Sequence, residues 1–102
     1  MYAYRTEWII PGGRMREAHD MLAAETERIK QTRGGDVIVR IYTPSYSPNV
    51  LVFELVRKSE KANRKFWDEY NASPEGQAFW EKWRAVAKRS LGTERWFVTE
   101  FR

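Results

Sequence analysis

The stretch Ser-Pro-Glu-Gly-Gln-Ala-Phe-Trp-Glu-Lys-Trp, residues 73–83, says most about the fold of this chain. Ser73 is a good N-terminal helix cap, and Pro74 suits the first helical turn, where its missing N–H has no partner to lose. Phe79 and Trp83 are four residues apart, so they share one helix face, and a further tryptophan lies one position round. A helix so rich in aromatic side chains needs a broad apolar surface beneath it. We therefore expect a sheet under this helix, with room for a flat pocket between them.

The rest of the chain divides into strand-like and helix-like segments that lead to this helix and away from it. The patterns predict strands over 2–10, 37–43, 50–57 and 94–101, and helices over 14–32, 60–71 and 74–91. Pro11-Gly12-Gly13 ends the first strand, Gly34-Gly35 is a typical helix stop, and the last helix is expected to end before Gly92.

The predicted order is β-α-β-β-α-β, with the second helix broken at Ala72-Ser73. Right-handed crossovers fold this order into a four-stranded antiparallel sheet with the helices on one face, an α+β fold of the ferredoxin-like type. We expect residues 1–102 to form a single domain.

Both faces of the predicted sheet are apolar. In the third strand, Leu51, Phe53 and Leu55 oppose Val50, Val52 and Val56; in the fourth, Trp96 and Val98 oppose Phe97 and Phe101. The helices can cover only one face, so the other would expose an apolar patch on the order of several hundred Å², which monomers seldom tolerate. We expect a second copy of the chain to cover it, sheet against sheet, in a two-fold dimer.

The composition limits the classes of function. Lys and Arg number 18 and Asp and Glu 14, and the resulting charge of +4 permits an anionic partner without requiring one. The absence of cysteine excludes disulfides, thiolate metal sites and a cysteine nucleophile, and a single histidine, His19, cannot build a His-rich metal site. No apolar run approaches the roughly 20 residues of a membrane span. The N-terminus lacks the features of a signal peptide, so we expect a cytoplasmic protein without a metal.

Charged residues interrupt strands that are otherwise apolar: Arg5, Glu7, Arg40, Glu54 and Glu100. Arg5 and Glu7 share a pleat face, about 7 Å apart along the strand. One interpretation is an Arg–Glu network that fixes strand register or a dimer interface. Another is simple exposure at an edge of the sheet. The functional interpretation is the polar corner of a ligand pocket, in which Arg5 binds an anion or enolate and Glu7 acts as a base. In that case Arg40 and Glu54 would also contact the ligand.

Aromatic residues of the two last helical segments could line a flat pocket or fill a core: Trp67, Tyr70, Phe79, Trp80 and Trp83. Tyr70 is the best candidate for a polar handle on a bound ring, and it completes a predicted catalytic set with Arg5 and Glu7. An empty volume of roughly 300 Å³ or more between sheet and helices would favour ligand binding, and a solid aromatic core would favour a structural role.

In its motifs the chain resembles the dimeric α/β-barrel superfamily, and within it the NIPSNAP-like proteins. The matching features are Tyr2 to Arg5, Pro11-Gly12, Pro48-Asn49 and the stretch Pro74-Glu75-Gly76-Gln77-Ala78-Phe79. The resemblance implies that two ferredoxin-like sheets pair into a barrel and that each subunit has a ligand cavity between sheet and helices. It favours a small-molecule-binding protein of unassigned activity, with an aromatic or apolar ligand between sheet and helices, and one hypothesis is that it acts by binding and not by catalysis.

The chain is more distantly similar to the antibiotic-biosynthesis-type monooxygenases, a group that includes small haem-degrading enzymes. Those enzymes carry a Trp and a His ten residues apart and an Asn on the first strand, and here Tyr70, Trp80 and Arg5 stand at the matching positions. Without the His the obvious iron ligand is missing, so the resemblance does not extend to haem, and we expect no cofactor. The enzymatic alternative is a cofactor-independent monooxygenase, an isomerase or a polyketide cyclase.

RNA binding is the remaining class to test, because the RNA-recognition motif has the same element order and this chain is basic. That motif stacks bases on aromatic residues of its third strand, within a defined signature. The corresponding segment here, residues 50–57, has one aromatic residue, and Glu54 in its middle would repel phosphate. We therefore do not expect a nucleic-acid partner.

Overall fold

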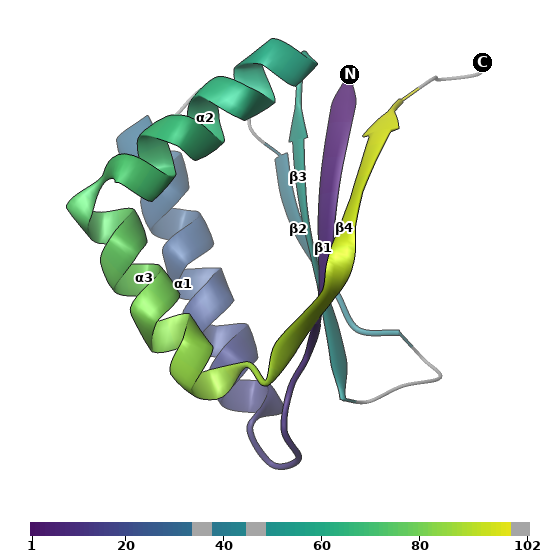
Figure 1. Ribbon diagram of the computed structural model, residues 1–102, viewed down its shortest axis with the longest axis vertical. Coiled ribbons are helices and arrows are strands. Elements are labelled where there is room, and N and C mark those ends of the chain that lie inside the picture. The colour runs from purple at the N-terminus through teal and green to yellow at the C-terminus, as the bar shows by residue number, and fades with distance from the viewer. Residues whose placement is uncertain (34–37, 45–48, 99–102) are drawn as a thin grey trace.

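Three helices lie on one side of a four-stranded sheet in the computed structural model (Figure 1). The elements in chain order are β1 (Tyr2–Ile9), α1 (Met15–Arg33), β2 (Ile38–Tyr42), β3 (Val50–Arg57), α2 (Glu60–Ala72), α3 (Pro74–Val86) and β4 (Arg89–Phe97). This order confirms the ferredoxin-like prediction, with the second helix broken into α2 and α3.

The structure describes residues 1–33, 38–44 and 49–98. Several predictions lie outside these residues: the helix stop at Gly34-Gly35, the strand start at Val37, the turn segment 45–48 that includes Pro48, and the end of the last strand with Glu100 and Phe101.

The strands follow the order β2-β3-β1-β4, and each neighbouring pair is antiparallel. Between Glu7 and Trp8 the pairing of β1 with β4 shifts by one residue, because Leu91 forms a bulge that is followed by Gly92 at φ 137°. The edge strand β4 is exposed along all nine of its residues.

The prediction of a helix up to residue 91 was wrong. The helix ends at Val86, because Ala87 is extended and donates its N–H to the Trp83 carbonyl oxygen at 2.8 Å. The next N–H, of Lys88, already bonds to the Ile9 carbonyl oxygen of β1 at 2.8 Å. Gly92 therefore lies in β4, next to the bulge, and does not end a helix.

The break between α2 and α3 is built by a serine and a glycine. The Ser73 hydroxyl accepts the Gly76 N–H at 3.0 Å and donates to the Tyr70 carbonyl oxygen at 2.7 Å, which confirms the predicted cap. A Cβ on Gly76 would lie 2.0 Å from the same carbonyl oxygen, so only glycine lets α3 begin this close to the end of α2.

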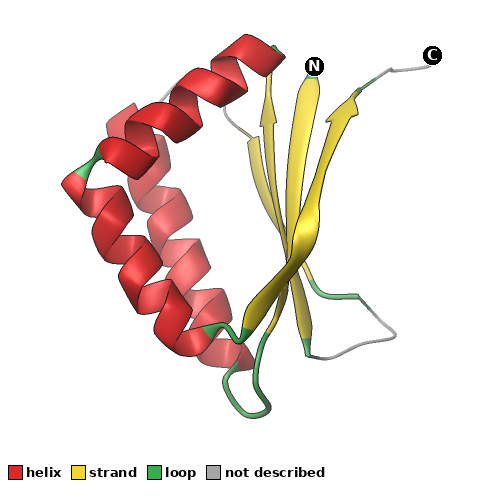
Figure 2. Ribbon diagram, viewed as in Figure 1, coloured by secondary structure: helices red, strands yellow, loops and turns green. Residues whose placement is uncertain are grey.

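The core lies between the helices and one face of the sheet. Its buried members include Ala18, Leu22 and Ile29 of α1, Leu51, Phe53 and Leu55 of β3, Phe66 and Tyr70 of α2, and Trp83 and Val86 of α3. In Figure 2 the helices form one layer against the strands, and in the described part of the chain no element crosses the opposite face of the sheet. No helix among the described residues has the length and apolar character needed to cross a membrane.

Candidate functional site

The sheet separates the predicted site residues into two groups. Arg5, Glu7, Arg40 and Glu54 lie on the face away from the helices, which we call the open face. Trp67, Tyr70, Phe79, Trp80 and Trp83 lie on α2 and α3, on the other side of the sheet. Within one chain the two groups therefore do not form one pocket, and the catalytic roles suggested for Arg5 and Glu7 stay a prediction.

An ion-pair network occupies the centre of the open face. The Glu54 carboxylate is only 2% exposed and is bonded by the Arg5 guanidinium, by Arg40 at 3.2 Å and by the Tyr42 hydroxyl at 3.1 Å. Burial by itself would raise the pKa of Glu54, but the hydrogen bonds from these three donors outweigh it and hold the pKa below its ordinary value. Glu54 is therefore an anion at neutral pH, and Glu7 takes no part in this network.

Apolar side chains surround the charged centre of the open face. The exposed ones are Met1, Ile38, Tyr42, Trp96 and Val98. Half of the surface of Trp96 is accessible, although tryptophan is usually among the more buried residues. The open face is thus an apolar surface around a charged centre, in which two arginines share the carboxylate of Glu54.

A cavity of about 180 Å³ lies on the other side of the sheet, between the strands and the helices. Its aromatic walls come from four elements: Tyr4 and Trp8 of β1, Phe53 of β3, Trp67 and Tyr70 of α2, and Trp80 and Trp83 of α3. The rest of the lining includes Leu22, Glu25, Thr26 and Ile29 of α1 and Ser90 and Thr93 of β4. This cavity by itself is smaller than the roughly 300 Å³ expected for a ligand site. It lies against a larger groove that shares its Tyr4, Trp67 and Trp80 walls.

Two polar atoms in the cavity wall have no hydrogen-bond partner among the described residues. They are the indole nitrogen of Trp83, a residue that is 1% exposed, and the hydroxyl oxygen of Thr26. The indole N–H groups of Trp67 and Trp80 are both satisfied, by Asn63 and Asn71. An unsatisfied buried donor costs about 1–3 kcal/mol and is rare in native structures, so a hydrogen-bond acceptor brought to the Trp83 N–H would stabilise the protein.

Tyr70 uses its hydroxyl inside the protein. The hydroxyl donates to the Glu25 carboxylate, which Arg28 holds from its other side with two hydrogen bonds of 2.8 and 2.7 Å. Burial and the bond to Glu25 both raise the pKa of Tyr70, so the phenol keeps its proton at neutral pH. In this state the Tyr70 hydroxyl is a neutral donor to Glu25, and the catalytic role suggested for Tyr70 stays a prediction.

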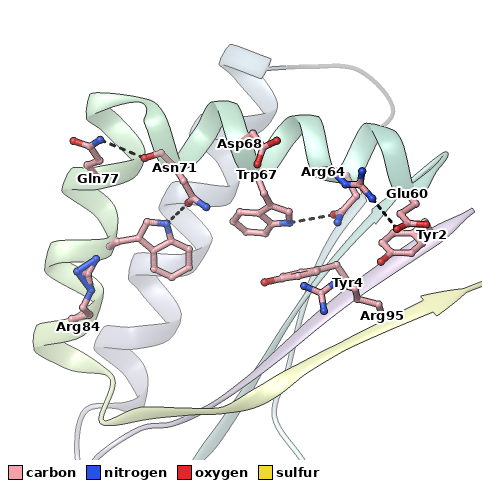
Figure 3. A pocket seen from close by; sticks show the side chains of 12 residues that line it. Tyr2, Tyr4, Glu60, Arg64, Trp67, Asp68, Asn71, Gln77, Arg84 and Arg95 are labelled. Atoms are coloured by element: carbon pink, nitrogen blue, oxygen red, sulfur yellow. Dashed lines mark hydrogen bonds and ion pairs between the residues drawn. The ribbon is translucent and has the colours of Figure 1, made fainter.

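The groove beside the cavity has a volume of about 770 Å³ and runs along α2 and α3 over the start of β1 and the end of β4 (Figure 3). Sequence reasoning missed most of its polar lining: Asn63, Arg64, Asn71, Gln77, Arg84 and Arg95. Only one signal could have found part of it. Asn63 precedes Trp67 by four residues on a helix, and its amide oxygen accepts the Trp67 N–H at 3.2 Å.

No group of three or more His, Cys, Asp or Glu side chains in the described part of the chain could hold a metal ion. His19 is exposed on α1 and lines neither the cavity nor the groove.

Solved structures of other proteins share this fold. No family model and no curated protein matches the chain. A NIPSNAP domain protein from Burkholderia xenovorans superposes with a TM-score of 0.81 at 16% identity, covering 100% of this chain and 98% of that one. The chain has the fold of NIPSNAP proteins.

Two further solved structures connect this fold to the oxygenases. A proposed antibiotic biosynthesis monooxygenase from Deinococcus radiodurans has a TM-score of 0.76 at 8% identity, covering 100% of this chain and 96% of its own. SnoaB, a cofactor-independent oxygenase from Streptomyces nogalater, has a TM-score of 0.74 at 16% identity, covering 98% and 94%. Both resemblances stated from the sequence are therefore confirmed at the level of fold.

Proposed function

We propose that this NIPSNAP-like chain binds a small, flat, largely aromatic molecule in the cavity between sheet and helices, with part of the ligand in the adjoining groove. The observation that carries this is the unpartnered N–H of Trp83 in an aromatic wall. A ligand with a carbonyl or ether oxygen would satisfy this donor and cover the apolar walls at once.

The ring arrangement supports a flat ligand. The ring centroids of Tyr4 and Trp67 are 5.0 Å apart, those of Trp67 and Trp80 6.3 Å, and those of Trp8 and Trp80 6.2 Å. These spacings are typical of offset and edge-on aromatic pairs, and a further ring can extend such a cluster on its accessible side. The cavity and groove together reach the volume range of small-molecule sites, roughly 300–1,000 Å³.

The same proposal includes a homodimer through the open face. Trp96 and the other exposed apolar side chains of that face would be covered by a second copy, while the Glu54 network brings no unpaired carboxylate into the interface. Since β4 carries both Trp96 and the Thr93 side of the cavity, pairing of the sheets would also support the cavity wall.

Calorimetric titration with 2-naphthamide, a neutral two-ring compound with a carbonyl acceptor, tests ligand binding. We expect saturable one-site binding that Thr26→Leu weakens at least tenfold, because the larger side chain enters the cavity and removes a polar group that has no partner. Ala24→Leu is the matched control, since it enlarges an exposed side chain of the same helix. Equal affinity in all three proteins, or no binding at all, would refute the cavity as the site.

A second candidate function is oxidation of the bound aromatic by O₂ without a cofactor, favoured by the likeness to SnoaB. Conversion of a ring CH₂ to C=O by O₂ releases one water and needs no other reductant, so the substrate supplies all the electrons. Oxygen uptake with anthrone, compared with the spontaneous rate, tests this. A rate that does not depend on protein concentration leaves the chain a binding protein.

A further inference from the structure

We propose that the ligand is an aromatic acid whose carboxylate is bound by Arg95 of β4. This inference rests on the proposed binding function and adds the charge of the ligand. The Arg95 guanidinium lies over the ring of Tyr4, 5.6 Å from its centroid, and Tyr4 is a wall of both the cavity and the groove. Figure 3 shows Arg95 and Tyr4 together below Trp67.

The charges of the groove leave Arg95 available for an anion. Arg64 is paired with Glu60 at 3.2 Å, whereas neither Arg95 nor Arg84 has an ion pair among residues 1–33, 38–44 and 49–98. Asp68, on α2, is the only carboxylate other than Glu60 in the described lining. The groove thus offers two guanidinium groups that no carboxylate of the described residues neutralises.

Arg95 is better placed than Arg84 to hold the acid group. Its contact with Tyr4 orients the planar guanidinium, and less side-chain freedom is lost when an oriented group binds. A carboxylate at this position leaves the attached rings free to lie along Trp67 and Trp80 toward the cavity. Arg84, on α3, has no aromatic contact among those found in the described residues, and Figure 3 shows it toward the opposite end of the groove.

The chemistry of the site favours a carboxylate on a small ring system. A guanidinium presents two parallel N–H donors that match the two oxygens of a carboxylate. The cavity of about 180 Å³ has aromatic walls and no arginine in its lining, whereas Arg95 lines the groove beside it. These residues therefore fit a ligand with one carboxylate bound by Arg95 and a ring system that lies along the aromatic walls.

The test compares 2-naphthoate with 2-naphthamide, which has nearly the same shape but no charge, by calorimetry at low ionic strength. We expect the wild-type protein to bind naphthoate roughly five- to tenfold more tightly, the range between an exposed ion pair and a charge-assisted hydrogen bond. Arg95→Gln should remove this preference, so that the variant binds naphthoate and naphthamide with equal affinity. Added salt should weaken naphthoate binding only.

Two matched variants make the result specific. Arg89→Gln removes an exposed arginine from the same strand outside the groove, and Arg84→Gln removes the other unpaired arginine of the groove. Both should keep the preference for naphthoate. Equal binding of the two compounds by the wild-type protein overturns the proposal, and so does a loss of the preference in Arg84→Gln instead of Arg95→Gln. If the amide binds without a preference for the acid, the proposed binding function survives; if neither compound binds, both proposals fail.

Discussion

Replacing Gly76 by alanine tests how the break between α2 and α3 holds the cavity together. The added Cβ would lie 2.0 Å from the Tyr70 carbonyl oxygen, 2.9 Å from its carbonyl carbon and 3.1 Å from the Ser73 hydroxyl oxygen. The closest of these atoms are backbone, so no side-chain rotation relieves the contact. The two helices must move apart by about 1.4 Å to bring this Cβ from 2.0 Å to 3.4 Å, where ordinary contact begins, at the corner between α2 and α3.

The magnitude follows from three opposing effects. Alanine inside a helix is favoured over glycine by about 1 kcal/mol. Forcing apart a well-packed contact costs about 1–3 kcal/mol or more, and weakening the Ser73 cap costs about 1 kcal/mol. Because the contact is with backbone, the upper part of that range applies. We expect Gly76→Ala to lower the free energy of unfolding by about 2–3 kcal/mol.

Urea and thermal denaturation followed by circular dichroism measure the effect. A loss of this size corresponds to a fall in Tm of about 10–20 °C for a domain of roughly this length. Gly12→Ala is the control, because a Cβ at Gly12 meets no atom within 4 Å. It should leave stability unchanged or slightly raised. If Gly76→Ala is as stable as the wild-type protein, the close approach of α3 to the Tyr70 carbonyl oxygen is not real.

Three further predictions concern the two faces of the sheet. Glu54→Gln should lower the free energy of unfolding at pH 7 by about 1–2 kcal/mol, and no more, because its half-exposed arginine partners can regain water. The depressed pKa of Glu54 predicts that the wild-type protein loses stability as pH falls below about 4.3, and this loss should be smaller in Glu54→Gln. Tyr70→Phe should lower the free energy of unfolding by about 1 kcal/mol at neutral pH, because the hydrogen bond to Glu25 is lost. Above about pH 10 the phenol ionises in the unfolded chain but not in the folded protein, so the wild-type protein loses stability there and Tyr70→Phe should lose less. Trp96→Asp should convert a dimer to a monomer in light-scattering chromatography at micromolar concentration, because it places a charge in the apolar open face.

Each of these predictions has a result that would count against it. An acid unfolding profile of Glu54→Gln identical to that of the wild-type protein would show that the open-face network does not control stability. If the stability of Tyr70→Phe falls at high pH as much as that of the wild-type protein, ionisation of the Tyr70 phenol does not control stability there. A monomeric wild-type protein would remove the dimer, and with it the explanation for the exposed Trp96.

The element order was predictable because its signals are local. Alternating side chains in β1 and β3, the serine caps and the proline after Ser73 depend only on neighbouring residues. The structure places both strands and the starts of α2 and α3 within one or two residues of the prediction, but β4 begins at Arg89 and not at Glu94 as predicted. The error at the end of α3 has a different origin. Residues 87–91 have no strong helix-breaking residue, and the decisive interaction is the bond from Lys88 to Ile9, far away in the chain.

The site was predictable only in part, for the same reason. The aromatic residues of α2 and α3 follow a helical period, so their shared side could be inferred, and they do line the cavity and groove, except Phe79, which packs behind them on Trp83. Arg95 gave no signal, because its importance comes from lying on Tyr4 of another strand.

By itself, the sequence determined the strands, the helices, the broken second helix and the excess of apolar strand surface, because period and capping are properties of neighbouring residues. Tertiary structure alone decided that Arg5, Arg40 and Glu54 lie on the open face while Arg95 and Trp83 lie on the side of the sheet that the helices cover. Which face of a strand meets the helices depends on register and on the direction of the crossovers, and both are set only when distant segments pair.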